Sequence, residues 1–589
     1  MGKPIWVFIL MISLLLVVAC DTAAPEVVEK EVIKEVLVEK IVEKEKLVEV
    51  IKEVEKLVVA TPTAAPPPGS VKGPSGSVIS ATSDMAEMGM DPSLDNTGNV
   101  RPFTNEMYIY AIEQAPSGEL IGGAATKWEV SDDHLSWIWT VREGVKFHNG
   151  ETMTAEDFSW SWNRAILSPE AETGQSFAYG PNIESIRAEG NTVVVRTKQP
   201  EALMPIWWAP AWTGPTGAIL SQVEFERTGV EGIRNGAVGA GPYKFVQRSR
   251  GEFVKLEAFE DHYCCVPGFK ELTVLEIPEI ATRLALLKTG GADLVEATPS
   301  VKRDIEEAGF RTYSALAAQT STMFFMYQNI PQSPFYDQRV REAINLAIDR
   351  ESIAERIYAG EASANTSYPS GPGTFGFAAD LEPYPYDLDR AKQLMKDAGY
   401  EKGFKVRIVT YLFDADFPDM PTLSQALLGY LQDLGIEGNV QVMEYSAVKG
   451  EMVSVVEAAC GKDQPLWCTG VEANPEVAAQ EPYTLILRGT DARFMWLSNL
   501  LSYNHPNGRR PIIQLDHVAA AIDGIYAEFD LDKQRALAED YNRLMHREYR
   551  QTPLLYGNAV FGISDKIASW QPISGRTYPH NHWSLLPAK

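Results

Sequence analysis

The sequence is poor in the features that mark membrane-embedded and nucleic-acid-binding proteins. Beyond the N-terminus, no window approaches the roughly 18 unbroken apolar residues that a membrane helix needs. The 589 residues include 53 Lys and Arg against 79 Asp and Glu, which gives a net charge of −26, and no basic cluster offsets it. Because an acidic surface repels phosphate backbones, the composition argues against nucleic-acid binding.

The common catalytic motifs are missing as well. There is no Gly-x-Ser-x-Gly elbow, no His-Glu-x-x-His, no phosphate-binding loop and no dinucleotide fingerprint. The 8 His are scattered apart from His580 and His582, an alternating pair that we interpret as part of a solvated tail. The sequence therefore predicts neither an enzyme nor a bound metal or other cofactor. A secreted hydrolase is the rival interpretation from another class.

Cysteine is scarce, with five residues in the whole chain. Beyond Cys20 there remain Cys264, Cys265, Cys460 and Cys468, and an even count in an exported protein permits disulfides. Cys460 and Cys468 can close a short loop, and pairing with the two adjacent cysteines is equally allowed. Their spacing does not match a zinc site.

The N-terminus carries an export signal. Lys3 is followed by an apolar run over residues 5–19, and that run ends in Leu16-Val17-Val18-Ala19-Cys20. This ending resembles the bacterial lipoprotein signal, which implies that residues 1–19 are a signal peptide and that Cys20 is lipidated at Sγ. The alternative is an uncleaved membrane anchor. Either way, we expect the body outside the cytoplasm, on the outer face of the cell membrane.

A low-complexity stretch separates this signal from the body. Residues 26–59 are dominated by Val, Ile, Leu, Glu and Lys, and the apolar residues from Leu47 to Val58 follow a 4-3-4 spacing. Residues 61–76 are rich in Pro, Ala, Gly and Ser, which is typical of a semi-rigid linker. We interpret residues 20–76 as a helical or disordered stalk, with an oligomerising coiled coil as the alternative.

The body begins near Ser77 and is long enough for two or more domains. Strand and helix patterns alternate along it without one repeated unit, which predicts a mixed α/β, multi-lobed fold. Strands are expected over 78–81, 137–141 and 192–197, and helices from Ala155 with Thr154 as N-cap, over 338–359 and over 388–398.

Four blocks of sequence follow one another through the body. They read ATKWEVSDD (125–133), WIWTVREGVKFHNG (137–150) and TAED (154–157); GAGPY (239–243); PFYDQRVREA (334–343) with AIDR (347–350); and YDLDRAK (386–392) with AGY (398–400). In order and spacing they resemble the bacterial extracellular solute-binding proteins of family 5, the peptide- and nickel-binding components of ABC importers. One departure is Ala240, where the family has Thr. Within the blocks, Trp139 and Phe147 are expected in the core.

The resemblance implies a periplasmic-binding-protein-like fold, with two hinged α/β lobes and an extra domain on lobe one. The solute would bind in a buried cleft between the lobes, and the permease and ATPase subunits of an importer would be the partners. Carried onto this chain, the solute-binding body spans 77–589, with lobe one at about 77–113, 236–320 and 550–589, the extra domain at about 114–235, and lobe two at about 321–549.

The ligand class is suggested by one short stretch. In family members that bind peptides, an Asp that anchors the peptide amino group follows a Trp in lobe two. Here Trp467 matches the Trp, but Gly470 stands at the Asp position and Glu472 lies two residues further on. The resemblance therefore implies a peptide or peptide-like solute without ordinary α-amino recognition, unless Glu472 takes the anchoring role. An oligosaccharide or another small solute is the alternative.

Other candidate ligand contacts are aromatic or polar side chains of lobe two. Trp496 offers a flat apolar face for a ring or a sugar, while Tyr327 and Asn329 match a strand that enters lobe two. The pair Trp207 and Trp208 fits core packing better than ligand contact.

The lipoprotein signal makes a direct prediction. Cys20→Ser should yield a chain that carries no acyl group and leaves the membrane fraction, because the thiol is the acceptor of the lipid. Intact mass spectrometry and membrane fractionation measure both properties. Acyl chains on the Cys20→Ser protein would contradict the lipoprotein interpretation.

Overall fold

The computed structural model divides the chain into two units, residues 1–60 and 61–589. It describes the following residues, all of which belong to the second unit: 73–85, 89–94, 100–115, 120–169, 171, 176, 179–208, 214–372, 374–411, 417–444, 447–448, 480–491, 500, 504–505, 512–513, 515–572 and 581–588. The predicted signal peptide and Cys20 lie outside these residues. So does the stalk, apart from the last residues of the linker.

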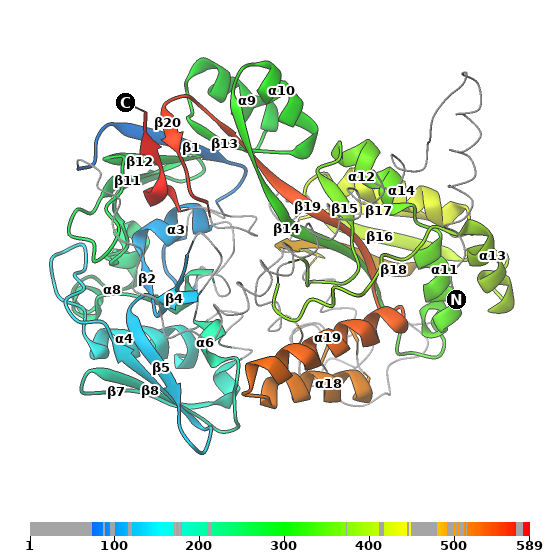
Figure 1. The fold of residues 1–589 in the computed structure, drawn as a ribbon, viewed down its shortest axis with the longest axis horizontal. Coiled ribbons are helices and arrows are strands. Elements are labelled where there is room, and N and C mark those ends of the chain that lie inside the picture. Colours follow the sequence, from blue (N-terminus) through cyan, green and yellow to red (C-terminus); the bar gives the residue numbers. More distant parts are fainter. Residues whose placement is uncertain are drawn as a thin grey trace, which may run out of the picture. The chain divides into compact units, whose positions relative to one another are not determined.

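One 11-stranded mixed sheet runs through the body, and two of its strands connect the strands of lobe one to those of lobe two. These are β14 (Arg311–Phe325) and β19 (Thr552–Ile563), which pair antiparallel and are called the crossing strands. Figure 1 shows them side by side, passing from the elements of lobe one to those of lobe two. The strand order along the sheet is β10-β11-β12-β1-β13-β19-β14-β18-β16-β17, with β15 pairing β19 off this path.

In lobe one the central strands are parallel and point toward the middle of the crossing strands. β1 (Ser77–Thr82) pairs in parallel with both β12 (Glu271–Glu276) and β13 (Leu294–Ala297). β13 lies antiparallel to β19, with its last residue opposite Val560 and its first opposite Ile563. Val560 is the nearer of the two to the middle of β19. The carboxyl ends of all three strands therefore face that point.

In lobe two the strands are also parallel, and they approach the crossing strands from the side opposite lobe one. β16 (Lys405–Tyr411) pairs in parallel with β17 (Glu437–Met443) and β18 (Tyr483–Asp491). β18 lies antiparallel to β14, with Asp491 opposite Gln319. The carboxyl ends of these strands consequently also face the middle of the crossing strands.

The extra domain is a four-stranded antiparallel sheet of order β5-β6-β8-β7. The predicted strand over 137–141 is β6 (Ser136–Val141), and α4 (Ala155–Trp162) begins at the predicted N-cap Thr154 with a full capping box. Trp162 stacks on Trp208 with ring centroids 3.6 Å apart and meets Trp139 edge-on. Trp139, like Phe147, is buried in the core as predicted. These tryptophans hold the domain together by burying large apolar faces.

The helix predicted over 338–359 is two helices. α11 (Gln338–Leu346) ends at Ala347, and α12 (Arg350–Tyr358) starts after Asp349, whose carboxylate accepts a hydrogen bond from Ser352 N at 3.0 Å. The helical apolar period continues across the junction, so it did not reveal the break. The cap at Asp349 is what ends one helix and starts the other.

The remaining elements complete the mixed α/β fold. They are α3 (Arg101–Met107), β2 (Ile109–Tyr110), β3 (Ile112–Gln114), β4 (Leu120–Gly122), β5 (Ala125–Val130), η3 (Asn163–Leu167), η4 (Gly180–Asn182), β7 (Ile183–Glu189), β8 (Thr192–Thr197), α6 (Met204–Trp207), η5 (Gly214–Gly217), β9 (Ala218–Ile219), α8 (Gln222–Gly236), β10 (Tyr243–Ser249), β11 (Phe253–Ala258), α9 (Ile280–Thr289), η6 (Pro299–Val301), α10 (Lys302–Glu307), η7 (Pro334–Tyr336), β15 (Ala362–Ala364), α13 (Leu388–Asp397), α14 (Met420–Gln432), α18 (Asp516–Ala527), α19 (Leu531–Arg547), β20 (Ile567–Ser569), η8 (His582–Ser584) and β21 (Leu586–Pro587).

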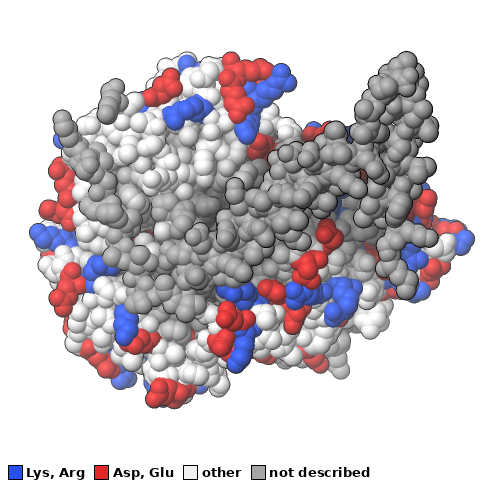
Figure 2. Space-filling view, in the orientation of Figure 1, with Lys and Arg blue, Asp and Glu red and all other residues white. Residues whose placement is uncertain are grey.

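The surface charge follows the composition. On the face shown in Figure 2, basic and acidic side chains of the described residues are interspersed, without a continuous basic patch. No helix of the described part is long and apolar enough to cross a membrane.

The C-terminal segment is anchored in lobe one, which corrects the prediction of a solvated tail at His582. His582 and Glu106 are fully buried. The Glu106 carboxylate accepts hydrogen bonds from His582 N at 2.6 Å and Trp583 N at 3.2 Å, and His582 Nε2 lies 3.1 Å from Ser80 Oγ. Serine, histidine and glutamate are close as in a hydrolase triad, but all three are sealed in the core. We interpret them as a structural anchor.

This anchor predicts a large loss of stability when the carboxylate is removed. Glu106→Ala leaves the buried N–H of His582 and the part-buried N–H of Trp583 without their acceptor and should lower the free energy of unfolding by about 3–5 kcal/mol. Chemical denaturation measures the change, and Glu252→Ala, at an exposed turn, is the matched control. A loss no larger than that of the control would contradict the anchoring role.

Candidate ligand cleft

The described fold places one candidate site, at the middle of the crossing strands. Parallel strands present loops and unpaired backbone groups at their carboxyl ends, and open α/β sheets bind ligands there. Here the carboxyl ends of β1, β12 and β13 face this point from lobe one, and those of β16, β17 and β18 face it from lobe two. The two edges thus bound a region between the lobes.

The crossing strands lose their regular pairing at this point. The register of β14 against β19 shifts between Ala315 and Gln319, and Ala317 has a left-handed φ of 46°. Opposite, a Cβ on Gly557 would lie 2.9 Å from the Phe417 ring, so only glycine fits without displacing that ring. Each crossing strand is therefore irregular where it passes between the lobes. This is the geometry expected of a hinge.

An ion pair bridges the two lobes beside this hinge. Lys302 Nζ, from α10 in lobe one, lies 2.7 Å from Glu361 Oε1, which precedes β15 in lobe two. Asn558 Nδ2 donates to the other oxygen of Glu361 at 2.8 Å, and Asn558 Oδ1 accepts from Ala317 N at 2.9 Å. One asparagine therefore ties both the bridging carboxylate and the irregular residue of β14 to β19.

The pKa of Glu361 is that expected of a carboxylate in an ion pair. Burial favours the neutral acid, but hydrogen bonds from Lys302 and Asn558 outweigh it, and the pKa of Glu361 lies below its ordinary value of 4.5. The group is therefore ionised at neutral pH and holds its charge against Lys302.

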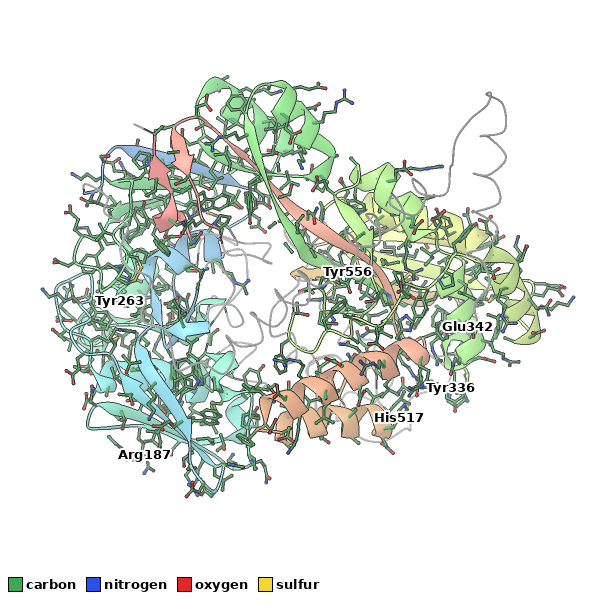
Figure 3. The ribbon with its side chains drawn as sticks, in the orientation of Figure 1. Arg187, Tyr263, Tyr336, Glu342, His517 and Tyr556 are labelled. Atoms are coloured by element: carbon green, nitrogen blue, oxygen red, sulfur yellow. A yellow bond between two sulfur atoms is a disulfide. The ribbon has the colours of Figure 1, made fainter. Side chains whose placement is uncertain are left out.

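A buried network of hydroxyl and amide groups supports the lobe-two side of the hinge. Asn365 Nδ2 donates to Thr320 Oγ1 at 2.7 Å, which joins the segment after β15 to β14. The Thr366 hydroxyl lies 3.2 Å from the hydroxyl of Tyr556 on β19. Figure 3 shows Tyr556 beside the crossing strands, and burial raises the pKa of its phenol. The network fixes β15 and its following loop to both crossing strands.

A crevice lies at the hinge itself. Its enclosed space is about 10 Å³, room for about one water molecule, whereas an ordinary ligand pocket encloses roughly 300–1,000 Å³. This crevice alone is too small for a peptide-sized solute. Its walls come from lobe one, both crossing strands and lobe two: Glu296, Ala297, Pro299, Gln319, Pro418, Asn558, Ala559, Val560 and Phe561.

A second contact joins the extra domain to lobe two. His134 stacks on Phe529, which follows α18, with ring centroids 4.2 Å apart. Ala202 N donates to Tyr526 O at 3.3 Å. The polypeptide therefore connects the lobes through the crossing strands, and side chains connect them again here.

Two of the predicted ligand residues lie away from the hinge. Tyr327 and Asn329 occupy the turn that follows β14, beyond Phe325, rather than the strand itself. Phe325 pairs with Leu485 near the start of β18, at the edge opposite the carboxyl ends. The structure does not bring Tyr327 and Asn329 to the candidate cleft, and their contact with the solute stays an untested prediction.

The other predicted site residues lie outside the described residues. These are Cys20, Trp467, Gly470, Glu472 and Trp496. In the sequence, the stretch around Trp467 joins β17 to β18, and Trp496 follows β18, so both stretches are connected to carboxyl ends of parallel strands.

Sequence reasoning missed the hinge residues. Lys302, Glu361 and Asn558 lie far apart in the chain and belong to no motif. The available signal was indirect: Gly557-Asn558 interrupts an otherwise apolar strand.

Comparison with known proteins identifies the family. The sequence profile of the bacterial extracellular solute-binding proteins, family 5 (middle region), matches residues 119–495, more than half of the chain. The chain belongs to family 5 of the bacterial extracellular solute-binding proteins. This match covers all four predicted blocks in full, so the resemblance seen in the sequence is confirmed.

Individual relatives are distant. Heme-binding protein A of Haemophilus influenzae is 23% identical over 393 residues, which are 63% of this chain and 72% of that protein. The glutathione-binding protein GsiB of Escherichia coli K12 is 30% identical over 289 residues, 48% of this chain and 54% of that protein. The chain thus matches only about half of the GsiB length.

A solved structure shares the fold. The periplasmic binding protein DppA of Helicobacter pylori, in complex with the peptide STSA, superposes with a TM-score of 0.69 at 21% identity, over 88% of this chain and 99% of that one. This confirms the predicted fold class, a periplasmic-binding-protein-like body of two α/β lobes.

The bridge at the hinge predicts a pH-dependent stability. A carboxyl group whose pKa is lowered by folding stabilises the fold above its unfolded pKa, and the contribution disappears as pH falls through the folded pKa. Glu361→Gln should therefore lower the melting temperature at pH 7 and lower it less at about pH 3, where part of the Glu361 population is protonated.

Differential scanning calorimetry of both proteins across this range checks the prediction. Glu355→Gln, at an exposed position of α12, is the matched control. A difference between wild type and Glu361→Gln that is the same at both pH values would show that charge plays no part.

Proposed function

We propose that this protein is the substrate-binding lipoprotein of an ABC importer, which captures a peptide or peptide-like solute between its lobes and delivers it to the permease. The observation that carries the proposal is the meeting of two sets of strand carboxyl ends at one hinge. A cleft built in this way encloses a solute from two sides and excludes water, which is what a capture protein needs.

The relatives agree with a transport role. The family consists of extracellular solute-binding proteins, and the relatives named above bind heme, glutathione and a peptide. Glutathione and STSA are peptides, so a peptide-like solute has the broader support. An oligosaccharide or another small solute is the second candidate, favoured by the tryptophans Trp467 and Trp496.

A binding role also accounts for what the described residues offer chemically. The one serine–histidine–glutamate group is sealed in the core, and the groups at the hinge are engaged in structural hydrogen bonds. The ion pair and the asparagine there serve to set the angle between the lobes. The site is thus suited to holding a solute, and the permease and ATPase subunits would supply the work of transport.

The solute itself can be identified without assumption. Native mass spectrometry of the gently purified chain should show a bound mass that unfolding releases, and fragmentation should give a peptide or a modified peptide. Release of an oligosaccharide would contradict the peptide proposal and support the second candidate. Recovery of a processed substrate and its product would instead point to an enzyme.

Once the solute is identified, the way in which the cleft anchors it can be tested. A buried ammonium without a carboxylate partner is costly, and Gly470 provides none, so we expect binding to tolerate N-acetylation of the solute. Trp467→Ala should weaken binding by about 1–3 kcal/mol through loss of a buried contact, whereas Glu472→Gln should have little effect.

Isothermal titration of the solute and its acetylated form into both variants makes the comparison. Should acetylation abolish binding and Glu472→Gln weaken it strongly, Glu472 is the anchor and the expectation is wrong.

A further inference from the structure

The loop between β11 and β12 holds a cluster that plays no part in the proposed transport role. The loop spans residues 259–270 and ends at the amino end of β12, on the edge opposite the carboxyl ends that face the hinge. Figure 3 shows Tyr263 of this loop among the elements of lobe one, away from Tyr556 at the crossing strands. Any function of the cluster is therefore separate from the cleft.

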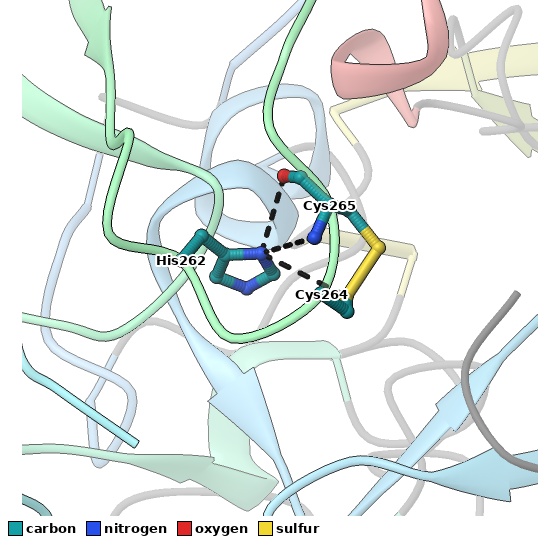
Figure 4. Close-up of side chains that lie close together, drawn as sticks. All are labelled: His262, Cys264 and Cys265. Carbon is teal, nitrogen blue, oxygen red and sulfur yellow. Dashed lines mark hydrogen bonds between the residues drawn. A yellow bond between two sulfur atoms is a disulfide. The ribbon is translucent and has the colours of Figure 1, made fainter. Parts of the chain in front are cut away.

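Three donor atoms gather in this loop. His262 Nδ1, Cys264 Sγ and Cys265 Sγ all lie within 4.8 Å of one another, and Cys264 Sγ is 3.8 Å from the ring nitrogen (Figure 4). The side chains are half-buried, so small ions and reagents can reach them. Cys264 and Cys265, which are adjacent in the sequence, form a disulfide with each other. In this oxidised form neither sulfur is a thiolate.

The Nδ1 atom of His262 contacts the backbone of Cys265. It lies 3.1 Å from Cys265 N and 3.2 Å from Cys265 O, and a metal bound at Nδ1 would replace these contacts. A neutral ring nitrogen binds metal without first losing a proton.

Neighbouring groups hold the loop in place. The Arg142 guanidinium lies 4.9 Å from the Tyr263 ring centroid and donates to Gly122 O and Gly123 O. The His148 ring packs edge-on against Phe259, with centroids 5.1 Å apart. The loop is thus fixed to the extra domain on both sides of the cluster, which limits the rearrangement that ligation would require.

We propose that His262, Cys264 and Cys265 form a redox-gated site for one thiophilic metal ion of the zinc or copper(I) class. A dithiol reductant gives two electrons to the Cys264–Cys265 bond and becomes a disulfide itself, while each Sγ gains one proton. Metal binding then releases these two protons to solvent and forms two metal–thiolate bonds and one metal–imidazole bond. A disulfide oxidant that takes two electrons from the two thiolates, and two protons from solvent to become a dithiol, re-forms the Cys264–Cys265 bond and expels the ion.

The donor set decides the class of ion. Thiolate and imidazole select zinc and copper(I) over magnesium and calcium, which prefer oxygen. Ligands bound at about 2.0–2.3 Å to a shared tetrahedral ion lie about 3.3–3.8 Å apart. The 3.8 Å between His262 Nδ1 and Cys264 Sγ already fits such an ion, and reduction of the disulfide frees the two sulfurs to separate. Three protein ligands leave a fourth position for water or another small donor.

The test uses Zn²⁺ and the full chain with its other three cysteines replaced, as Cys20→Ser/Cys460→Ser/Cys468→Ser. Isothermal titration before and after reduction by a phosphine, which is oxidised to its oxide, should show one Zn²⁺ bound per chain in the reduced form alone. His262→Ala in this background should weaken binding at least about tenfold, since loss of an outer-shell partner alone has that effect. Further substitution of Cys264 and Cys265 by Ser should abolish it.

His517→Ala, at an exposed histidine, is the matched control and should bind as the background does. Alkylation and mass spectrometry establish that both thiols are free, and circular dichroism establishes that each variant is folded. A reduced, folded chain that binds no Zn²⁺ would overturn the proposal. So would binding that persists undiminished in His262→Ala, or a Cys264–Cys265 bond that resists reduction.

Discussion

The whole arrangement depends on two strands that belong to both lobes. β14 and β19 are hydrogen-bonded to each other on either side of the point where they pass from one lobe to the other. Each half of this ribbon is part of a larger sheet, with β13 on one side and β18 on the other, and is therefore rigid. Any change in the angle between the lobes must be taken up where the pairing is irregular, at Ala317 and its neighbours on β19.

This constraint explains why polar groups are concentrated there. Asn558 satisfies the backbone at Ala317 that the broken pairing leaves without a strand partner, and it also orients Glu361 toward Lys302. On the side of lobe two, Asn365 hydrogen-bonds to Thr320 of β14, and the Tyr556 hydroxyl of β19 hydrogen-bonds to Thr366. A buried irregularity without these partners would leave polar groups unsatisfied and would be costly. The same residues thus stabilise the fold and define the angle at which the candidate cleft is held.

Local features of the sequence predicted local structure well. The strands at Val78 and Thr192 follow from alternation of apolar and polar residues, and the cap at Thr154 follows from one hydrogen bond within four residues. All three predictions are confirmed. The family blocks predicted the fold class, also confirmed. Features formed between distant segments were missed: His582 is buried because Glu106, 476 residues earlier, accepts its N–H. The break at Asp349 was missed because the apolar period continues through it.

The sequence predicts where in the fold the candidate site lies, but it does not predict which residues form the hinge. The prediction of a cleft between two lobes follows from family membership, whereas the hinge contacts join residues such as Lys302 and Asn558 that no local pattern connects. The sequence pattern predicts a strand at Tyr327, but β14 ends two residues earlier, at Phe325. A one-dimensional pattern says which residues form a strand and leaves open which end of it faces the cleft.

The central claim is that the two lobes close around a solute by bending the crossing strands. Small-angle scattering of the purified chain, emptied by unfolding and refolding and then saturated with its own solute, measures this most directly. A ligand that binds the closed form better shifts the population toward it, so the account predicts a smaller radius of gyration in the saturated protein. An unchanged radius at saturation would contradict it.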